Sequence, residues 1–173
     1  GQGITHKAET NNLKITNFET FYRVILSYTL TDDDVVVDKG VIISCSYDFT
    51  ASNIIIPDIL DGQKIIGLGH SVFANKSITN IILPTQLRFI GFASLEKNNL
   101  SEIILPATLD SIGYNAFFNN YINKITFEEG AVIRYIGINS FRANNIDTLI
   151  IPKSVEYIDY QAFSGSKIEY LDF

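Results

Sequence analysis

Apolar residues recur along most of this chain in short clusters separated by a nearly constant distance. From residue 54 onward, segments of the kind Ile-Ile-Leu-Pro return at spacings of 27, 22, 22 and 24 residues. A fixed period of about 20 to 50 residues is typical of solenoids, in which each repeat forms one coil. The segments are Ile54-Ile55-Ile56-Pro57, Ile81-Ile82-Leu83-Pro84, Ile103-Ile104-Leu105-Pro106, Ile125-Thr126-Phe127-Glu128 and Leu149-Ile150-Ile151-Pro152.

Other positions keep constant offsets within this frame. A glycine column is followed four residues later by a large apolar column, and five residues beyond that by an aliphatic column. Length changes fall only between the proline and glycine columns, with five residues added after Pro57 and two after Glu128. Insertions confined in this way are expected on a loop-bearing side of the coil. The three columns are Gly69, Gly91, Gly113, Gly137 and Asp159; Phe73, Leu95, Phe117, Phe141 and Phe163; and Ile78, Leu100, Ile122, Ile146 and Ile168.

This spacing predicts the path of one coil. Ile78-x-x-Ile81-x-Leu83 is the pattern of a strand whose alternate side chains point inward, and the proline after it ends the ladder. The chain is then expected to turn at the glycine column with positive φ, at Asp159 as well, and to form a short helical turn that carries the buried Phe column. An asparagine column formed by Asn98, Asn120 and Asn144 follows, and bonding to local backbone is favoured over a ligand ladder.

The N-terminal part of the chain does not repeat. Apolar residues from Tyr22 to Leu30 alternate with Arg23, Ile25, Ser27 and Thr29, which indicates a half-buried strand. Thr31 to Asp34 is expected to be its turn, and Val41 to Ser46 a further strand that leads into the first coil. We therefore assign residues 1–40 to a β-rich N-terminal cap and residues 41–173 to a solenoid of about five coils, since terminal coils need caps.

The phrase Ile112-Gly113-x-x-Ala116-Phe117, followed by an Asn-rich turn and Ile122-x-x-Ile125, resembles the BspA-like leucine-rich repeat family. The resemblance covers about residues 41–173, with departures at Glu128 in place of proline and Asp159 in place of glycine. It implies a leucine-rich-repeat solenoid, a right-handed superhelix of short parallel strands with turns and short helical turns. It also implies an exported, surface-displayed protein of bacteria or certain protozoa that acts in adhesion or host-protein binding, without shared catalytic residues.

Composition narrows the range of partners. Hydrophobic residues make up 46% of the chain and charged residues 18%, which favours a folded domain over disorder. The net charge is −6 with Lys and Arg scattered, so neither nucleic acid nor an anionic membrane is expected as a partner. No apolar run approaches the roughly 18 residues of a membrane span, and membrane association is expected only through an anchor outside this chain.

Candidate catalytic and metal-binding residues are few. His6, His70 and Cys45 favour structural or solvent-exposed roles, and a single cysteine excludes a multi-cysteine zinc site. The acidic run Asp32-Asp33-Asp34 lacks the ligand spacing of a calcium loop, so a solvated turn is favoured. We expect no catalytic site, no bound metal and no small-molecule cofactor.

The remaining candidate is a surface formed by the outward positions of the repeated strands. Stacking would place Ile82, Ile104 and Ile150 in an apolar stripe interrupted at Thr126, and such a stripe can mark a binding face. Sheet propensity alone would also explain β-branched residues there. The predicted binding residues are Asn80, Ile82, Glu102, Ile104, Lys124, Thr126, Thr148, Ile150 and Tyr170.

The leading functional hypothesis is a non-enzymatic interaction module, secreted or at the cell surface, that binds a host or other extracellular protein or a glycan through this face. The alternative is a structural spacer or assembly segment of a longer surface protein, stacking through the edge at Phe173. An enzyme that uses Asp32 to Asp34 with His70 is the third and weakest hypothesis.

Overall fold

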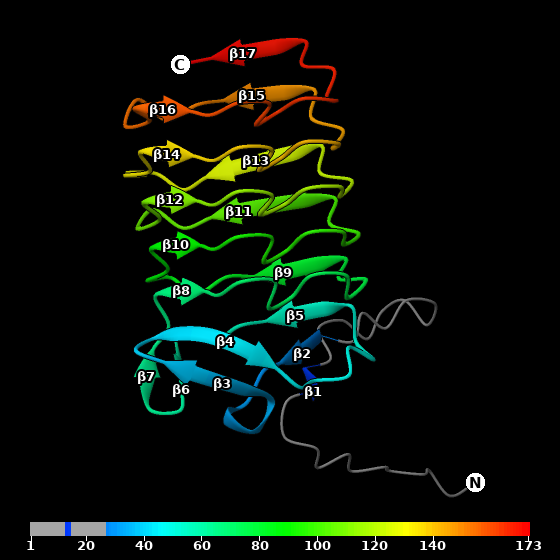
Figure 1. The fold of residues 1–173 in the computed structure, drawn as a ribbon, viewed down its shortest axis with the longest axis vertical. Helices are drawn as coiled ribbons and strands as arrows, with labels where there is room; N and C mark the ends of the chain where they lie inside the picture. The colour runs from blue at the N-terminus through cyan, green and yellow to red at the C-terminus, as the bar shows by residue number, and fades with distance from the viewer. Residues whose placement is uncertain (1–12, 15–26) are drawn as a thin grey trace, which may run out of the picture.

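The computed structural model describes residues 13–14 and 27–173, and these form a β-solenoid in which successive coils stack along one axis (Figure 1). Each regular coil contributes one strand to a face that we call the strand face, and a shorter strand to a second sheet on another side. The predicted leucine-rich-repeat solenoid of short parallel strands is confirmed, but its turns are not helical.

Seven strands lie on the strand face within the described residues. They are β2 (Ser27–Thr29), β5 (Asn53–Ile55), β9 (Asn80–Ile82), β11 (Glu102–Leu105), β13 (Lys124–Phe127), β15 (Thr148–Ile150) and β17 (Tyr170–Asp172). Hydrogen-bonded pairing divides them into two sheets, one ending at β9 and the other starting at β11. The solenoid has about seven turns rather than five, because β2 pairs in parallel with β5, with Tyr28 opposite Ile54.

The second sheet holds the hairpin β3–β4 and the two-residue strands of the later coils. They are β3 (Val35–Asp38), β4 (Val41–Cys45), β8 (Gly67–Leu68), β10 (Phe89–Ile90), β12 (Ser111–Ile112), β14 (Tyr135–Ile136) and β16 (Tyr157–Ile158). All neighbours from β4 to β16 pair in parallel, whereas β3 and β4 form an antiparallel hairpin. The expected strand from Val41 to Ser46 is thus present as β4, and it begins this second sheet next to β8.

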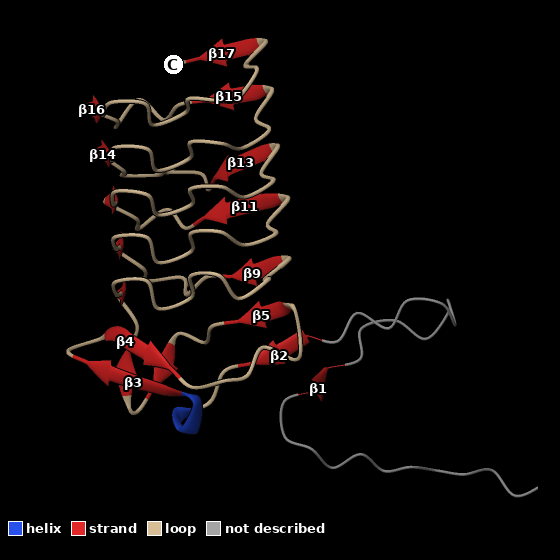
Figure 2. Cartoon of the chain, turned by 45° about the vertical axis from the view of Figure 1, so that its right-hand side comes forward, coloured by secondary structure: helices blue, strands red, loops and turns tan. Residues whose placement is uncertain are grey.

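The N-terminal part adds irregular elements around the first coils. β1 (Leu13–Lys14) pairs antiparallel with β2, and β6 (Ile59–Leu60) pairs with β7 (Gln63–Lys64) inside the insertion after Pro57. The expected turn at Thr31 to Asp34 is a 3-10 helix, Asp32–Asp34, drawn in blue in Figure 2. His6 and residues 22–26 of the expected strand from Tyr22 to Leu30 lie outside the described residues, and residues 27–29 of it form β2.

The core runs the length of the solenoid between the two sheets and the turns that connect them. Inward residues of the strands are mostly buried because side chains alternate along a strand, whereas Phe127 is half-buried and Leu171 is exposed. The large apolar column lies against them, with Phe117 and Phe141 fully buried and their rings stacked at 4.9 Å between centroids. Phe163 continues the stack on Phe141 at 5.4 Å.

The turns after the glycine column are not helical, so the expected short helical turn is wrong. Each turn has a left-handed residue two positions after the glycine column, and a second one four residues later. Left-handed residues of this kind interrupt a right-handed helix after a few residues. They are Ser71, Ala93, Asn115, Asn139 and Gln161, and then Asn75, Lys97, Asn119, Ala143 and Gly165.

The expected positive φ at the glycine column and at Asp159 is also wrong, because none of these five residues has a left-handed backbone. The glycines are needed for a different reason, which is the close approach of consecutive coils. A Cβ at Gly91 would lie 2.6 Å from the carbonyl oxygen of Leu68, and one at Gly69 would lie 2.7 Å from that of Ile42.

The asparagine column bonds to backbone, as predicted, and it links neighbouring coils as well. Asn120 Oδ1 accepts from the N–H of Leu100 at 3.2 Å in the preceding coil. Its Nδ2 donates to the carbonyls of Leu95 and Phe117 at 3.0 and 3.2 Å. Asn98 and Asn144 make equivalent bonds one coil before and one coil after. These buried amides therefore supply partners for backbone groups that the turns leave unpaired.

Candidate ligand-binding face

The structure places the predicted outward residues on one surface. Ile82, Ile104, Ile150 and Tyr170 expose 52%, 57%, 56% and 55% of their surface, and Thr126 is half-buried. Asn80, Glu102, Lys124 and Thr148 are exposed as well. Their common orientation follows from the two-residue period of the strands. That a partner binds them stays a prediction.

Register pairing arranges these residues in two rows. In the first row Glu102 lies opposite Lys124, Lys124 opposite Thr148, and Thr148 opposite Tyr170. In the second row Ile104 lies opposite Thr126, which interrupts the isoleucine stripe as the sequence predicts. Asn80 and Ile82 belong to β9, which has no residue pair with β11.

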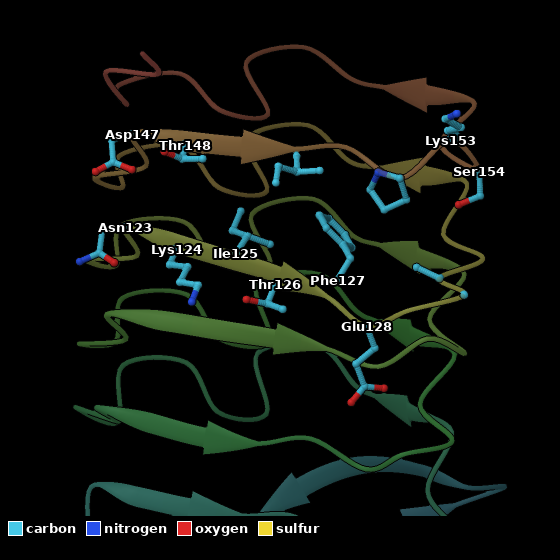
Figure 3. Close-up of a pocket in the computed structure, with 14 residues that line it drawn as sticks. Asn123, Lys124, Ile125, Thr126, Phe127, Glu128, Asp147, Thr148, Lys153 and Ser154 are labelled. Atoms are coloured by element: carbon cyan, nitrogen blue, oxygen red, sulfur yellow. The ribbon is translucent and has the colours of Figure 1, made fainter. Parts of the chain in front are cut away.

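The pairing of strands is uneven along this face. β11 and β13 pair at four positions and β15 and β17 at three, whereas β13 and β15 pair only at Lys124 and Thr148. Figure 3 shows β13 sloping away from β15 toward its carboxyl end. The divergence opens a groove of about 880 Å³, which we call the β13/β15 groove.

The β13/β15 groove has an apolar interior with charges of both signs around it. Four of the predicted binding residues, Lys124, Thr126, Thr148 and Ile150, line it, while the other five do not. The remaining lining residues were not predicted: Asn123, Ile125, Phe127, Glu128, Gly130, Ala131, Asp147, Pro152, Lys153 and Ser154.

Glu128, which stands where other coils have proline, shapes one end of the groove. Its backbone N–H donates to the carbonyl of Leu105 at 3.0 Å, so the ladder between β11 and β13 extends one residue further than proline would allow. Its carboxylate Oε2 accepts from the N–H of Ala107 at 3.1 Å. The missing proline and the two-residue insertion behind it were the sequence signals that could have pointed to this place.

A second hollow of about 450 Å³ lies on the other side of the turn at Gly130. Ile66, Arg88, Thr108 and Val132 are among its lining residues. Close to it in sequence, the Arg134 guanidinium donates to Asp110 Oδ1 at 2.8 Å and holds the pKa of that carboxyl below its usual range. Both partners of this ion pair are well exposed, and it links two neighbouring coils.

The candidate catalytic residues His70 and Cys45 make no hydrogen bond to each other or to the acidic run within the described residues. His70 is exposed, and its ring lies 4.5 Å from that of Phe92. Cys45 is half-buried, and burial raises the pKa of its thiol, which opposes formation of a nucleophilic thiolate.

The acidic run has a structural role at the 3-10 helix. Asp34 Oδ2 accepts from the N–H of Thr31 at 2.7 Å and from the Tyr28 hydroxyl at 2.9 Å. Asp32 accepts from the N–H of Asp61 at 2.6 Å. Within residues 13–14 and 27–173, no three or more His, Cys, Asp or Glu side chains are grouped as metal ligands would be. The same residues contain no helix of the length and apolarity that a membrane crossing requires.

Comparisons with known proteins agree with this architecture. A crystal structure of a leucine-rich repeat protein from Bacteroides ovatus superimposes with a TM-score of 0.56 at 18% sequence identity, over 97% of this chain and 53% of that chain. The chain thus spans about half the length of that protein, and the likeness shows the fold. No curated protein matches the sequence. Residues 45–173 match the family described as BspA type leucine rich repeat region, in six copies. The chain therefore belongs to the BspA-type leucine-rich repeat family.

Proposed function

We propose that this chain is a non-enzymatic interaction module of a secreted or surface-displayed protein, and that it binds a protein or glycan partner through the strand face. The observation that carries the proposal is the coincidence of two features on one face. The isoleucines Ile82, Ile104 and Ile150 are exposed on this face, and the β13/β15 groove, whose interior is apolar, opens on it beside Ile150. Exposed apolar residues around a concave site are typical of binding surfaces.

The chemistry of the described residues supports binding rather than catalysis. His70 and Cys45 are not arranged with a base or an acid that would activate them, and Asp32 and Asp34 are engaged with backbone groups and hydroxyls near the 3-10 helix. A catalytic site needs a nucleophile, base or acid placed together in a cleft. The β13/β15 groove instead offers apolar side chains with lysines and carboxylates at its rim.

The test is a binding screen with strand-face variants. The whole chain is applied to an array of glycans and an array of purified extracellular proteins, beside the Ile104→Arg/Ile150→Arg double variant. The variant should lose every specific signal yet unfold cooperatively, since both side chains are exposed. The matched control is Ile59→Arg, because Ile59 is equally exposed but lies on the hairpin after Pro57. Signals that survive in the folded double variant would refute the strand face as the binding surface.

A second candidate function is that of a spacer or assembly segment of a longer protein, in which coils stack end to end. Among the described residues β17 pairs with β15 on one side, and Leu171 and Phe173 are exposed on this chain. An open edge strand with apolar side chains can pair with another chain. Sedimentation equilibrium of the whole chain and of a Phe173→Asp variant tests this, since assembly predicts a mass that rises with concentration and falls in the variant.

A further inference from the structure

We infer that the β13/β15 groove binds an extended polypeptide segment, which lies along the two strands and places a large apolar side chain between Phe127 and Ile150. The inference rests on the proposed function of the strand face and narrows its partner from a protein or glycan to a polypeptide in extended conformation.

The backbone edges of β13 and β15 that face each other are mostly unpaired. β13 is fully paired on its side toward β11, and β15 is fully paired toward β17. Toward each other they pair only at Lys124 and Thr148. Beyond this point the facing edges of both strands run into the groove without a residue pair. An extended peptide presents alternating N–H and C=O groups at the spacing that a strand edge needs, and a glycan does not.

The side chains inside the groove are mainly apolar. Ile125 is buried beneath it, Phe127 is half-buried, and both belong to β13, as Figure 3 shows. Ile150 and Pro152 line the groove from β15 and the residues after it. One large apolar side chain of a bound strand would cover Phe127 and Ile150 together. The side chains beside it would point out toward solvent, because orientation alternates along an extended chain.

The charges around the groove are balanced. Lys124 and Lys153 line the groove together with Glu128 and Asp147, so two positive and two negative side chains surround it. Among the described residues, the ion pairs are Lys97 with Glu96 and Arg134 with Asp110, which leaves these four without an ionic partner. A balanced rim disfavours polyanions such as sulfated glycans. It suits a peptide that carries an acidic and a basic residue on either side of its apolar anchor.

The test uses a phage-displayed library of linear peptides, selected on the whole chain and counter-selected on an Ile150→Arg variant. Enriched peptides are then synthesised and titrated by calorimetry. We expect each to contain a large apolar residue and to bind at least about tenfold more weakly to Ile150→Arg and to Thr126→Arg. Binding to Ile59→Arg should stay within about twofold, because Ile59 is equally exposed but lies on β6, away from the groove.

Hydrogen exchange measured with and without peptide gives an independent readout. Pairing of the peptide with the open edges should slow hydrogen exchange at the backbone amides of Phe127 and Ile150. The exchange rate of the Ile104 amide should not change. Failure to enrich any peptide over the counter-selected variant, or peptide binding without this protection, would overturn the inference. If the glycan array gives signals that the Ile104→Arg/Ile150→Arg variant loses while no peptide is enriched, the proposed function stands and the peptide inference falls. If neither probe gives a strand-face-dependent signal, both fall.

Discussion

Two neighbouring interfaces of this solenoid share strand β13 and yet differ. Between β11 and β13 the ladder is closed at four positions, and between β13 and β15 it opens after one. On the turn side the same two interfaces are alike. Leu95 N–H donates to the carbonyl of Ala116 at 2.9 Å, and Phe117 N–H donates to that of Ser140 at 2.7 Å. The turn side therefore keeps the coils stacked where the strand face does not.

This comparison suggests a division of roles within each coil. The turn side contains the columns with constant offsets, namely the close-contact glycines, the buried Phe column and the buried asparagines. The strand face tolerates a missing proline and a two-residue insertion in one coil, and its ladder is interrupted both between β9 and β11 and between β13 and β15. Stability should thus respond strongly to changes on the turn side and weakly to changes on the strand face.

Removal of a buried ring should have the largest effect. Phe117 is fully buried and stacks on Phe141, so Phe117→Ala leaves a cavity on the turn side of both interfaces. We expect a loss of about 3–5 kcal/mol in the free energy of unfolding, measured by urea denaturation. The control is Tyr121→Ala, which should change the free energy of unfolding by no more than about 0.5 kcal/mol because the Tyr121 side chain is exposed. A loss below about 1 kcal/mol for Phe117→Ala would contradict the division of roles.

Deletion of a buried amide should come next. Asn120→Ala leaves the N–H of Leu100 and the carbonyls of Leu95 and Phe117 without this partner. We expect a loss of about 2–3 kcal/mol, because unsatisfied buried groups keep their desolvation penalty. Asn145→Ala is the matched control, since Asn145 is exposed. Equal unfolding midpoints for the two variants would show that the column does not link the coils.

Substitution of glycine by alanine at Gly91 and at Gly130 distinguishes a steric clash between coils from strain in a left-handed backbone. Gly91→Ala places a Cβ 2.6 Å from the carbonyl oxygen of Leu68 and should destabilise by about 1–3 kcal/mol through overpacking. Gly130 has open space around its Cβ position but a φ of +78°. Gly130→Ala should therefore cost about 1 kcal/mol, and Gly130→Asn should recover part of it, whereas Gly91→Asn should be worse than Gly91→Ala. Thermal unfolding of the four variants measures this contrast.

Replacing Glu128 with proline, the residue that other coils have at this position, tests the ladder between β11 and β13. Glu128→Pro removes the N–H that donates to Leu105 and the carboxylate that accepts from Ala107. We expect a loss of about 1 kcal/mol, measured by urea denaturation. Glu128→Gln keeps the backbone donor and should lose less. A stabilised Glu128→Pro variant would mean that the proline column is favourable in every coil and that Glu128 serves only the groove.

The smallest effect is expected at the exposed ion pair between Arg134 and Asp110. The pKa of Asp110 is lowered in the folded state, so its contribution to stability is present above the unfolded pKa of about 3.9 and is lost as the pH falls through the folded value. Arg134→Gln should raise the pKa of Asp110, followed by carboxyl NMR, and should weaken stability slightly at low salt. Arg88→Gln should raise the pKa of Asp110 less than Arg134→Gln does, because Arg88 acts on Asp110 only through its charge.

The sequence predicted the parts of this molecule that depend on local periodicity. Alternation along each strand correctly assigned Ile103 and Leu105 to the core and Ile104 to the surface. Constant offsets likewise placed Phe117 in the core and Asn120 next to the backbone of the turn. These assignments succeed because each depends on spacing within one coil and its repetition in the next.

The failures depend on relations between coils. The glycines suggested a left-handed backbone, but Gly91 and Gly113 are needed because the preceding coil is too close for a Cβ. The divergence of β13 from β15 is a relation between two coils, and the missing proline at Glu128 and the insertion behind it mark the coil without giving that geometry. For this reason Phe127 and Lys153, which line the groove, were missed, although Thr126 and Ile150 at its rim were predicted.

The asparagine column has a consequence for synthesis of the chain on the ribosome. Each asparagine bonds to backbone groups of the coil before its own, as Asn98 does with Phe73 and Ile78. A newly synthesised coil therefore keeps unpaired backbone N–H and C=O groups until the next coil has emerged from the exit tunnel. We expect the coils to fold in order during translation, each one completing its hydrogen bonds only after the next coil has been synthesised. The most recently synthesised coil should then be the most accessible to chaperones and proteases.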